Sequence, residues 1–187
     1  MLIRGGRVLQ AGAARLDEAD VLIEGDRISA VGAGLPASPD HEVIDAGGFL
    51  VLPGLVNAHT HAHNNLLRGL AGRWTLENLL NHAPALYANR TAEEQYLSAA
   101  IGAVEMVKTG CTAAYDLLMA IPVPTPEGVE AVARAYSDVG LRAVSAPAVG
   151  DMVFYETVPG LLDLLPRDLR QVVEAIRPAP TAGLLAL

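Results

Sequence analysis

The alternation of strand and helix patterns after residue 54 constrains the fold of this chain more than any other feature. Such an alternation is typical of a parallel sheet whose strands are joined by helices. The sequence therefore predicts a parallel α/β architecture for this part of the chain. The strand patterns cover residues 55–61, 111–116, 142–148 and 183–187, and the helix patterns cover 74–80, 91–109, 125–139 and 168–176.

The helix over 91–109 is predicted to begin with a capping box at Thr91 and Glu94 and to end at Gly110. Its larger apolar residues mark one helical face. The strand over 111–116 carries no charge before Asp116, so we expect it to be buried on both faces.

The first fifty residues follow a different pattern of short strands. We expect a strand at 2–9 broken by a glycine pair, a hairpin at 20–32, and a strand pair at 43–45 and 49–51. This density of short strands predicts part of a small β-sandwich. The predicted domains are therefore residues 1–53 and residues 54–187.

The composition of the chain argues against two classes of binding partner, nucleic acids and membranes. The chain has 187 residues, 51% hydrophobic and 18% charged, with a net charge of -8. An acidic chain without a basic run is a poor ligand for the polyanionic backbone of nucleic acids, so we expect no nucleic-acid partner. No apolar run approaches the length of a membrane span, so no membrane partner is expected either.

The single cysteine, Cys111, excludes a disulfide within the chain. Met1 is soon followed by Arg4 and Arg7 rather than by an apolar signal core, which predicts a cytoplasmic location. Motifs of common nucleotide-cofactor sites and serine hydrolases are absent from the sequence.

His59 and His61 are the candidate metal ligands. A turn at Pro53-Gly54 precedes a short apolar run that ends in these two histidines. On a strand, an i, i+2 spacing places both imidazoles on one face, and two neutral imidazoles form half of a divalent-metal site. The alternative is a pair of surface histidines.

Residues 53–61, Pro-Gly-Leu-Val-Asn-Ala-His-Thr-His, closely resemble the first barrel strand of the amidohydrolase superfamily. Residues 65–69, Asn-Leu-Leu-Arg-Gly, resemble its aminohydrolase branch, which includes cytosine and guanine deaminases and triazine hydrolases. The resemblance implies that the α/β fold consists of the first strands and helices of a (β/α)₈ TIM barrel, preceded by part of a β-sandwich. A complete barrel takes about 250 residues, so we expect the chain to be truncated near the fourth strand.

The resemblance also implies a function. His59 and His61 would hold one divalent ion, Zn²⁺ or Fe²⁺, that lowers the pKa of a bound water. The expected reaction is hydrolysis of a non-peptide carbon–nitrogen bond in a small-molecule substrate, as in deamination of an aminated heterocycle or cyclic amidine. One alternative from the same chemistry is a cyclic amide or imide hydrolase with a carboxylated lysine on the fourth strand.

The family's other ligands and its catalytic glutamate lie on or near later strands, so we expect no catalytic residue within this chain. Two histidines are one ligand short of a typical catalytic zinc site. The alternative from another class is therefore a catalytically incomplete fragment, or a half-barrel that needs a complementing C-terminal chain. A homo-oligomer is also possible by analogy with the family.

Four further residues are candidates for the site. His63, Arg68 and Trp74 are candidate substrate-binding residues, and Asp116 is a candidate partner of a metal-bound histidine. Each has an alternative: His63 as a third ligand, Arg68 in an ion pair, Trp74 as an anchor of its loop, and Asp116 as a cap.

Overall fold

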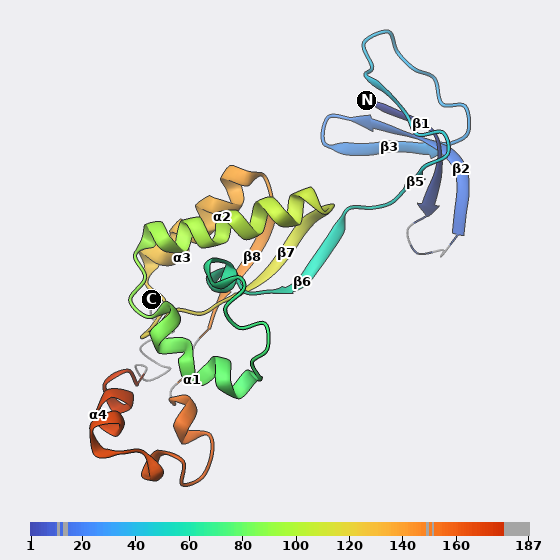
Figure 1. Ribbon diagram of the computed structural model, residues 1–187. Coiled ribbons are helices and arrows are strands. Elements are labelled where there is room, and N and C mark those ends of the chain that lie inside the picture. Colours follow the sequence, from blue (N-terminus) through green and yellow to red (C-terminus); the bar gives the residue numbers. More distant parts are fainter. Residues whose placement is uncertain (11, 13–14, 149, 151, 178–187) are drawn as a thin grey trace. The chain divides into compact units, whose positions relative to one another are not determined.

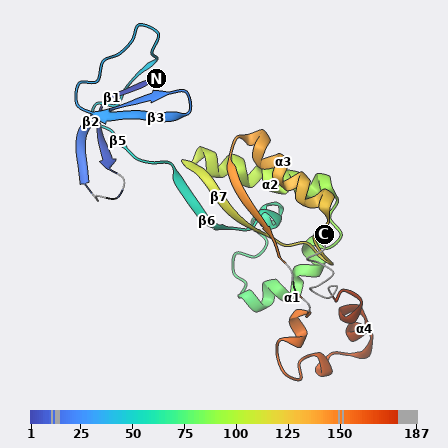
Figure 2. The same cartoon turned by 180° about the vertical axis from the view of Figure 1, so that it is seen from behind.

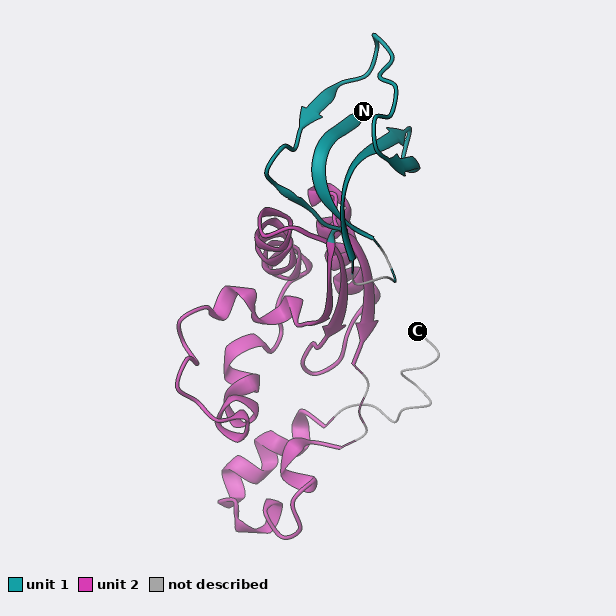
Figure 3. Cartoon of the chain, turned by 90° about the vertical axis from the view of Figure 1, so that its right-hand side faces the viewer, with its two compact units in different colours: residues 1–54 teal, residues 55–187 magenta. Residues whose placement is uncertain are grey.

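The computed structural model describes residues 1–10, 12, 15–148, 150 and 152–177. It divides into two compact units, Met1–Gly54 and Leu55–Leu187, which Figure 3 colours separately. The strand predicted at 183–187 lies outside the described residues. Within the described part, no helix is both long and apolar enough to cross a membrane.

The strands are β1 (Leu2–Gln10), β2 (Arg15–Glu24), β3 (Arg27–Gly32), β4 (Val43–Asp45), β5 (Leu50–Val51), β6 (Leu55–Thr60), β7 (Cys111–Leu118) and β8 (Arg142–Pro147). The α-helices are α1 (Leu76–Tyr87), α2 (Ala92–Lys108), α3 (Pro126–Val139) and α4 (Arg167–Ala175). Three 3₁₀ helices are η1 (Ala62–Leu67), η2 (Phe154–Glu156) and η3 (Leu162–Leu164).

The first unit is a five-stranded, β-sandwich-like sheet with β1 at its centre. The hairpin predicted at 20–32 is confirmed as the antiparallel pair β2 and β3. The predicted break at the glycine pair is a bulge within a continuous β1, where Gly5 has a φ of 70°. The Gly5 amide donates to the buried Asp20 carboxylate at 2.8 Å, which fixes the bulge.

The predicted pairing of 43–45 with 49–51 is wrong. β4 and β5 both run parallel to β1, beside different parts of it. The connection between them advances along β1 instead of reversing: the Ala46 amide donates to the Arg4 carbonyl, and the Arg7 amide donates to the Phe49 carbonyl. These bonds to β1 replace the ones that a hairpin would make.

The second unit contains the predicted parallel α/β arrangement. Its sheet has the order β6-β7-β8, all parallel, and α2 and α3 lie side by side on one face (Figures 1 and 2). The described residues form no closed barrel. The core between sheet and helices consists of Ala62, Ala99, Ala103, Met106, Ala114, Leu118, Val132, Ala135, Tyr136 and Leu141.

Capping residues in the sequence determine where α2 and α3 begin and where α3 ends. The capping box predicted for α2 is present: the Thr91 hydroxyl accepts from the Glu94 amide, and the Glu94 carboxylate accepts from the Thr91 amide. Thr125 caps α3, and Gly140 ends it in the left-handed conformation with a φ of 82°. Local backbone bonds at these residues therefore set where α2 and α3 begin and where α3 ends.

Two predictions of buried faces are wrong. On β7, Ala114, Asp116 and Leu118 are buried beneath the helices, whereas Tyr115 and Leu117 are exposed, because the described residues cover only one face of the sheet. On α2, the large apolar residues predicted to share a face are mostly exposed. The buried face carries Gln95, Ser98, Ala99, Gly102, Ala103 and Met106, whose mostly small side chains let the helix approach the sheet and α3 closely.

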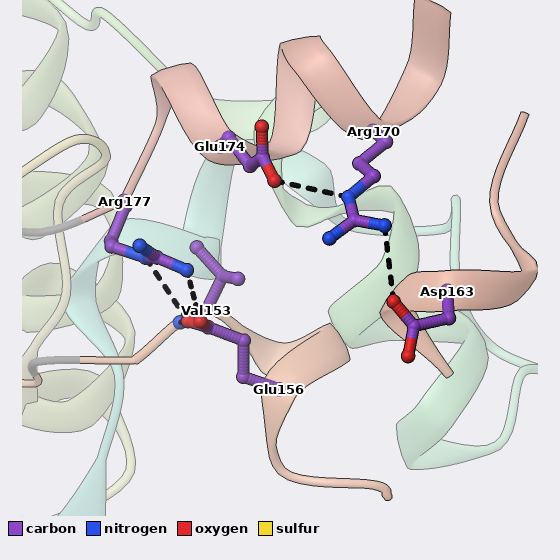
Figure 4. A network of polar contacts seen from close by, with 6 residues as sticks. All are labelled: Val153, Glu156, Asp163, Arg170, Glu174 and Arg177. Carbon is purple, nitrogen blue, oxygen red and sulfur yellow. Dashed lines mark hydrogen bonds and ion pairs between the residues drawn. The ribbon is translucent and has the colours of Figure 1, made fainter. Parts of the chain in front are cut away.

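Ion pairs hold together the segment that contains η2, η3 and α4 (Figure 4). Arg170 bridges Asp163 and Glu174, with a distance of 3.0 Å to each carboxylate. Arg177 pairs with Glu156, whose carboxylate also accepts from the Val153 amide at 3.0 Å. These contacts are mostly exposed, so each contributes about 1 kcal/mol or less, and Val153 and Val173 are the buried apolar residues of the segment.

Candidate metal centre

His59 and His61 point their ring nitrogens at each other at the carboxyl end of β6. The Nε2 atoms are 3.1 Å apart, and the ring centroids are 4.8 Å apart with the planes nearly perpendicular. Zinc–nitrogen bonds are about 2.0–2.1 Å long, so two nitrogens at this separation are able to bind one ion. The carboxyl end of a strand is also where parallel α/β barrels place their active sites.

A bulge in β6 gives the two histidines their direction. The register between β6 and β7 shifts between Asn57 and Thr60, so one extra residue of β6 lies in this interval. Thr60 is then level with the buried Asp116, and the side chains on either side of Thr60 point to the opposite face of the sheet. The Asn57 side chain supports the bulge by accepting from the His59 amide at 3.1 Å.

The hydrogen bond of His61 to β7 selects its tautomer. The Nδ1 atom lies 3.1 Å from the Leu117 carbonyl oxygen. A carbonyl oxygen only accepts, so Nδ1 of the neutral ring carries the hydrogen and Nε2 keeps its lone pair. The nitrogen facing His59 is therefore the one able to bind a metal.

His63 lies in η1, buried beside the pair. Its ring centroid is 5.4 Å from that of His61 and 5.0 Å from that of Tyr87. The Met119 amide donates to Nδ1 at 3.2 Å, and the Arg90 guanidinium donates to the His63 carbonyl. Burial, together with the nearby His61 and Arg90, lowers the pKa of His63 to about 3.

A cavity of about 270 Å³ lies next to His63. Its walls include His63, Tyr87, Arg90 and Gln95. Because Nδ1 of His63 accepts from Met119, the hydrogen of the neutral ring is on Nε2. His63 is thus a fixed neutral donor beside the histidine pair.

Asp116 is fully buried at the level of Thr60 and Ser145 in the sheet. Its Oδ1 accepts from the Ala62 amide at 2.8 Å, and Oδ2 has no hydrogen-bond partner among the described residues. Burial raises the pKa of this carboxyl, against the opposing effects of the Ala62 amide, the Tyr136 hydroxyl and His61. Asp116 therefore contacts the backbone next to His61, and its role as a partner of a metal-bound histidine stays a prediction.

Arg68 and Trp74 contact other parts of the second unit. Arg68 forms an ion pair with Glu105 of α2, and both side chains are about half exposed. The Trp74 ring packs against His82 of α1, with centroids 4.6 Å apart. The structure thus brings His59, His61 and His63 together, with Asp116 against the backbone next to His61. Arg68 and Trp74 instead contact residues of α2 and α1.

The residues present fit half of a catalytic metal site. Two neutral imidazoles with converging nitrogens suit Zn²⁺ or Fe²⁺. Among the described residues, no group of three His, Cys, Asp or Glu side chains is arranged to hold an ion.

Three residues near the site were not anticipated. Tyr87 and Arg90 hold His63, and Ser98 donates to the Ala62 carbonyl at 2.6 Å. Ser98 had a signal in the sequence, since it is a lone hydroxyl among small apolar residues of a helix. Tyr87 and Arg90 had none, because their role depends on how the connection over residues 62–90 folds back.

Comparison with known proteins identifies relatives of the chain. The amidohydrolase family model matches residues 50–180. A 5-methylthioadenosine/S-adenosylhomocysteine deaminase of Thermococcus sibiricus is 37% identical over 153 residues, which are 81% of this chain and 34% of that protein. A 5'-deoxyadenosine deaminase of Methanobrevibacter smithii is 38% identical over 125 residues, 66% of this chain and 27% of that protein.

Solved structures agree. The atrazine chlorohydrolase TrzN of Arthrobacter aurescens, in complex with zinc, matches with a TM-score of 0.71 and 25% identity, over 89% of this chain and 43% of that one. The resemblance predicted from residues 53–69 is thereby confirmed. The chain spans about a third of the length of the curated relatives that it matches.

Proposed function

Because this chain belongs to the amidohydrolase family, we propose that it supplies two histidine ligands, His59 and His61, to a metal-dependent hydrolase of non-peptide carbon–nitrogen bonds. One observation carries the proposal: the two Nε2 atoms converge to 3.1 Å at the carboxyl end of β6. The Leu117 carbonyl supports it by keeping the lone pair of His61 on Nε2.

Zinc or iron is the proposed ion, and the zinc in the similar triazine-hydrolase structure favours zinc. Such an ion, when bound, makes water a nucleophile near neutral pH. His59 and His61 would hold the ion, and the neutral His63 would donate a hydrogen bond toward the substrate from the adjoining cavity. Arg68 and Trp74 remain weaker candidates for substrate contact, because the structure pairs them with Glu105 and His82.

We propose deamination of an aminated heterocycle as the reaction. The similar curated proteins are named as deaminases of adenosine derivatives, and the similar structures include triazine hydrolases. Atrazine chlorohydrolase points to a second candidate, hydrolytic removal of another substituent from the same kind of ring. A cyclic amide or imide hydrolase is the remaining alternative within this chemistry.

The complete site needs further ligands, because catalytic zinc usually has three protein ligands and the described residues offer two. We propose that they come from polypeptide outside these 187 residues, on further strands of a (β/α)₈ barrel that residues 54–187 begin. Residues 1–53 would belong to the accompanying β-sandwich. The uncovered face of the parallel sheet, with Tyr115, Leu117 and Val144 exposed, supports this completion.

Native mass spectrometry of the purified protein tests the proposal, with total mass and bound metal determined on the same particle. We expect a particle that includes further barrel polypeptide to carry about one ion per site and to release ammonia from aminated heterocycles. Replacing His59 or His61 with Asn should abolish both signals, whereas His82→Asn, at an exposed helix position, should leave them unchanged. A metal-free particle without turnover would instead identify the chain as catalytically incomplete.

A further inference from the structure

The backbone on the far side of His61 is held by buried side chains from two different elements. The Ala62 amide donates to Asp116 of β7 at 2.8 Å, and the Ala62 carbonyl accepts from the Ser98 hydroxyl of α2 at 2.6 Å. Both side chains are fully buried, and Ala62 is 1% exposed. The peptide groups that join Ala62 to His61 and to His63 are therefore both fixed.

A third side chain completes this arrangement. The Asn65 amide group donates to the same Ala62 carbonyl at 3.1 Å. Glycine at position 102 leaves room for it, because a Cβ there would lie 2.2 Å from Asn65 Nδ2. Residues of β7, α2 and η1 thus converge on one alanine whose own side chain is a methyl group.

Stability alone does not account for Asp116. A buried carboxyl group with an unpartnered oxygen destabilises a fold, and such a group in a native structure calls for an explanation. Its Oδ2 accepts no hydrogen bond of normal geometry among the described residues, although the Tyr136 hydroxyl lies close enough to lower the pKa of the carboxyl. The hydroxyl of Ser145, which is level with Asp116 on β8, is also without a partner among these residues.

The same part of β7 also directs the His61 ring. Leu117, next to Asp116, accepts the hydrogen bond from His61 Nδ1. One strand segment therefore fixes both the backbone after His61, through Asp116, and the ring of His61, through Leu117. A shift of the Ala62 amide would move the ring away from the Leu117 carbonyl.

We propose that Asp116 and Ser98 are positioning residues that hold the Ala62 peptide groups and thereby set the tautomer and direction of the His61 imidazole. Neither residue touches the metal or the substrate. Asp116 is the stronger of the two, since Asn65 shares the acceptor of Ser98. The expected effect on metal binding rests on the proposed function, but the geometry of His61 is measurable without any metal.

The first test uses nitrogen-15 NMR of the histidine rings in the metal-free chain at pH 8. The wild type should show His61 as a single tautomer with the hydrogen on Nδ1. Asp116→Ala should give a mixture of tautomers, whereas Asp116→Asn, which keeps an oxygen acceptor for the Ala62 amide, should restore the single form. Val132→Ala, a core truncation in α3, controls for general loss of stability and should leave the His61 signal unchanged.

Zinc affinity is the second readout, measured by titration on the same variants. Loss of the groups that orient a ligand typically weakens metal binding 10–100-fold, and we expect about a tenfold loss or more in Asp116→Ala with a smaller loss in Ser98→Ala. A wild-type tautomer in Asp116→Ala, or equal tautomer mixing in Val132→Ala, would overturn the inference. Absence of zinc binding in a wild-type particle that includes the further barrel polypeptide, with the tautomer changes as predicted, would overturn the proposed function and leave the positioning role standing.

Discussion

The Nδ1 atom of His61 lies 3.1 Å from the carbonyl oxygen of Leu117, so β7 determines which nitrogen of this histidine is free for a metal. The strand that carries the histidine pair does not supply this contact itself. A metal centre of this design depends on the pairing of β6 with β7, and therefore on the fold of the second unit.

His63 makes the stability of the chain depend on pH. Its pKa is lowered to about 3 in the fold, so between pH 6.5 and about 3 the unfolded chain binds a proton there that the folded chain does not. Stability should therefore fall as the pH is lowered through this range, with a contribution of up to about 1.4 kcal/mol per pH unit from this group.

Urea unfolding at a series of pH values measures this slope. His63→Asn keeps an acceptor for the Met119 amide but does not titrate, so it should remove the contribution. An unchanged slope in this variant would show that other groups cause the acid sensitivity. His82→Asn, at an exposed position, serves as the control.

The capping box of α2 should contribute measurably to stability. Thr91→Ala removes the hydroxyl that accepts from the Glu94 amide, and such cap losses cost about 1 kcal/mol. Denaturant unfolding should register this loss, while Glu94→Gln, which retains a capping partner, should cost less. A larger loss in Glu94→Gln than in Thr91→Ala would mean that charge at the helix start, rather than the cap itself, is the stabilising factor.

Replacing Arg68 tests whether this residue forms only a surface ion pair or also contacts the substrate. Its pair with Glu105 is about half exposed on both sides, so Arg68→Met should change the free energy of unfolding by about 1 kcal/mol or less. A matched Glu105→Gln variant breaks the same pair. If Arg68→Met lowers turnover of the complete hydrolase and Glu105→Gln does not, Arg68 acts on the substrate as well.

The small-residue face of α2 should not tolerate larger side chains. Ala103 is fully buried in the core of the second unit, so Ala103→Leu should destabilise the chain by about 1–3 kcal/mol through overpacking. Leu97→Ala, on the exposed side of the same helix, should have a much smaller effect in the same unfolding assay. A larger effect of Leu97→Ala than of Ala103→Leu would instead support burial of the large apolar residues of α2, the orientation that the sequence favoured.

That orientation illustrates what the sequence of this chain could and could not predict. Helix ends were predictable, because Thr91, Thr125 and Gly140 act through local backbone bonds. The buried face of α2 was not, since apolar periodicity favoured the larger side chains over the small ones that allow close packing. The pairing of β4 and β5 with β1 was also missed, because strand partners depend on contacts distant in sequence.

The site shows the same division. His59 and His61 could be named from their spacing, and the structure brings their nitrogens together. The contact of Asp116 with the Ala62 amide could not be predicted, because it joins residues 54 positions apart. The bulge that directs the histidines had no recognisable signal either, since it is visible only in the register with β7.

The most direct measurement of the central claim is a zinc titration of the chain followed by nitrogen-15 NMR of its five histidines. We expect the Nε2 signals of His59 and His61 to move together along one saturation curve, while those of His41 and His82 stay unchanged. Movement of only one of the pair, or of His41 and His82 to the same extent, would contradict a shared metal site at the end of β6.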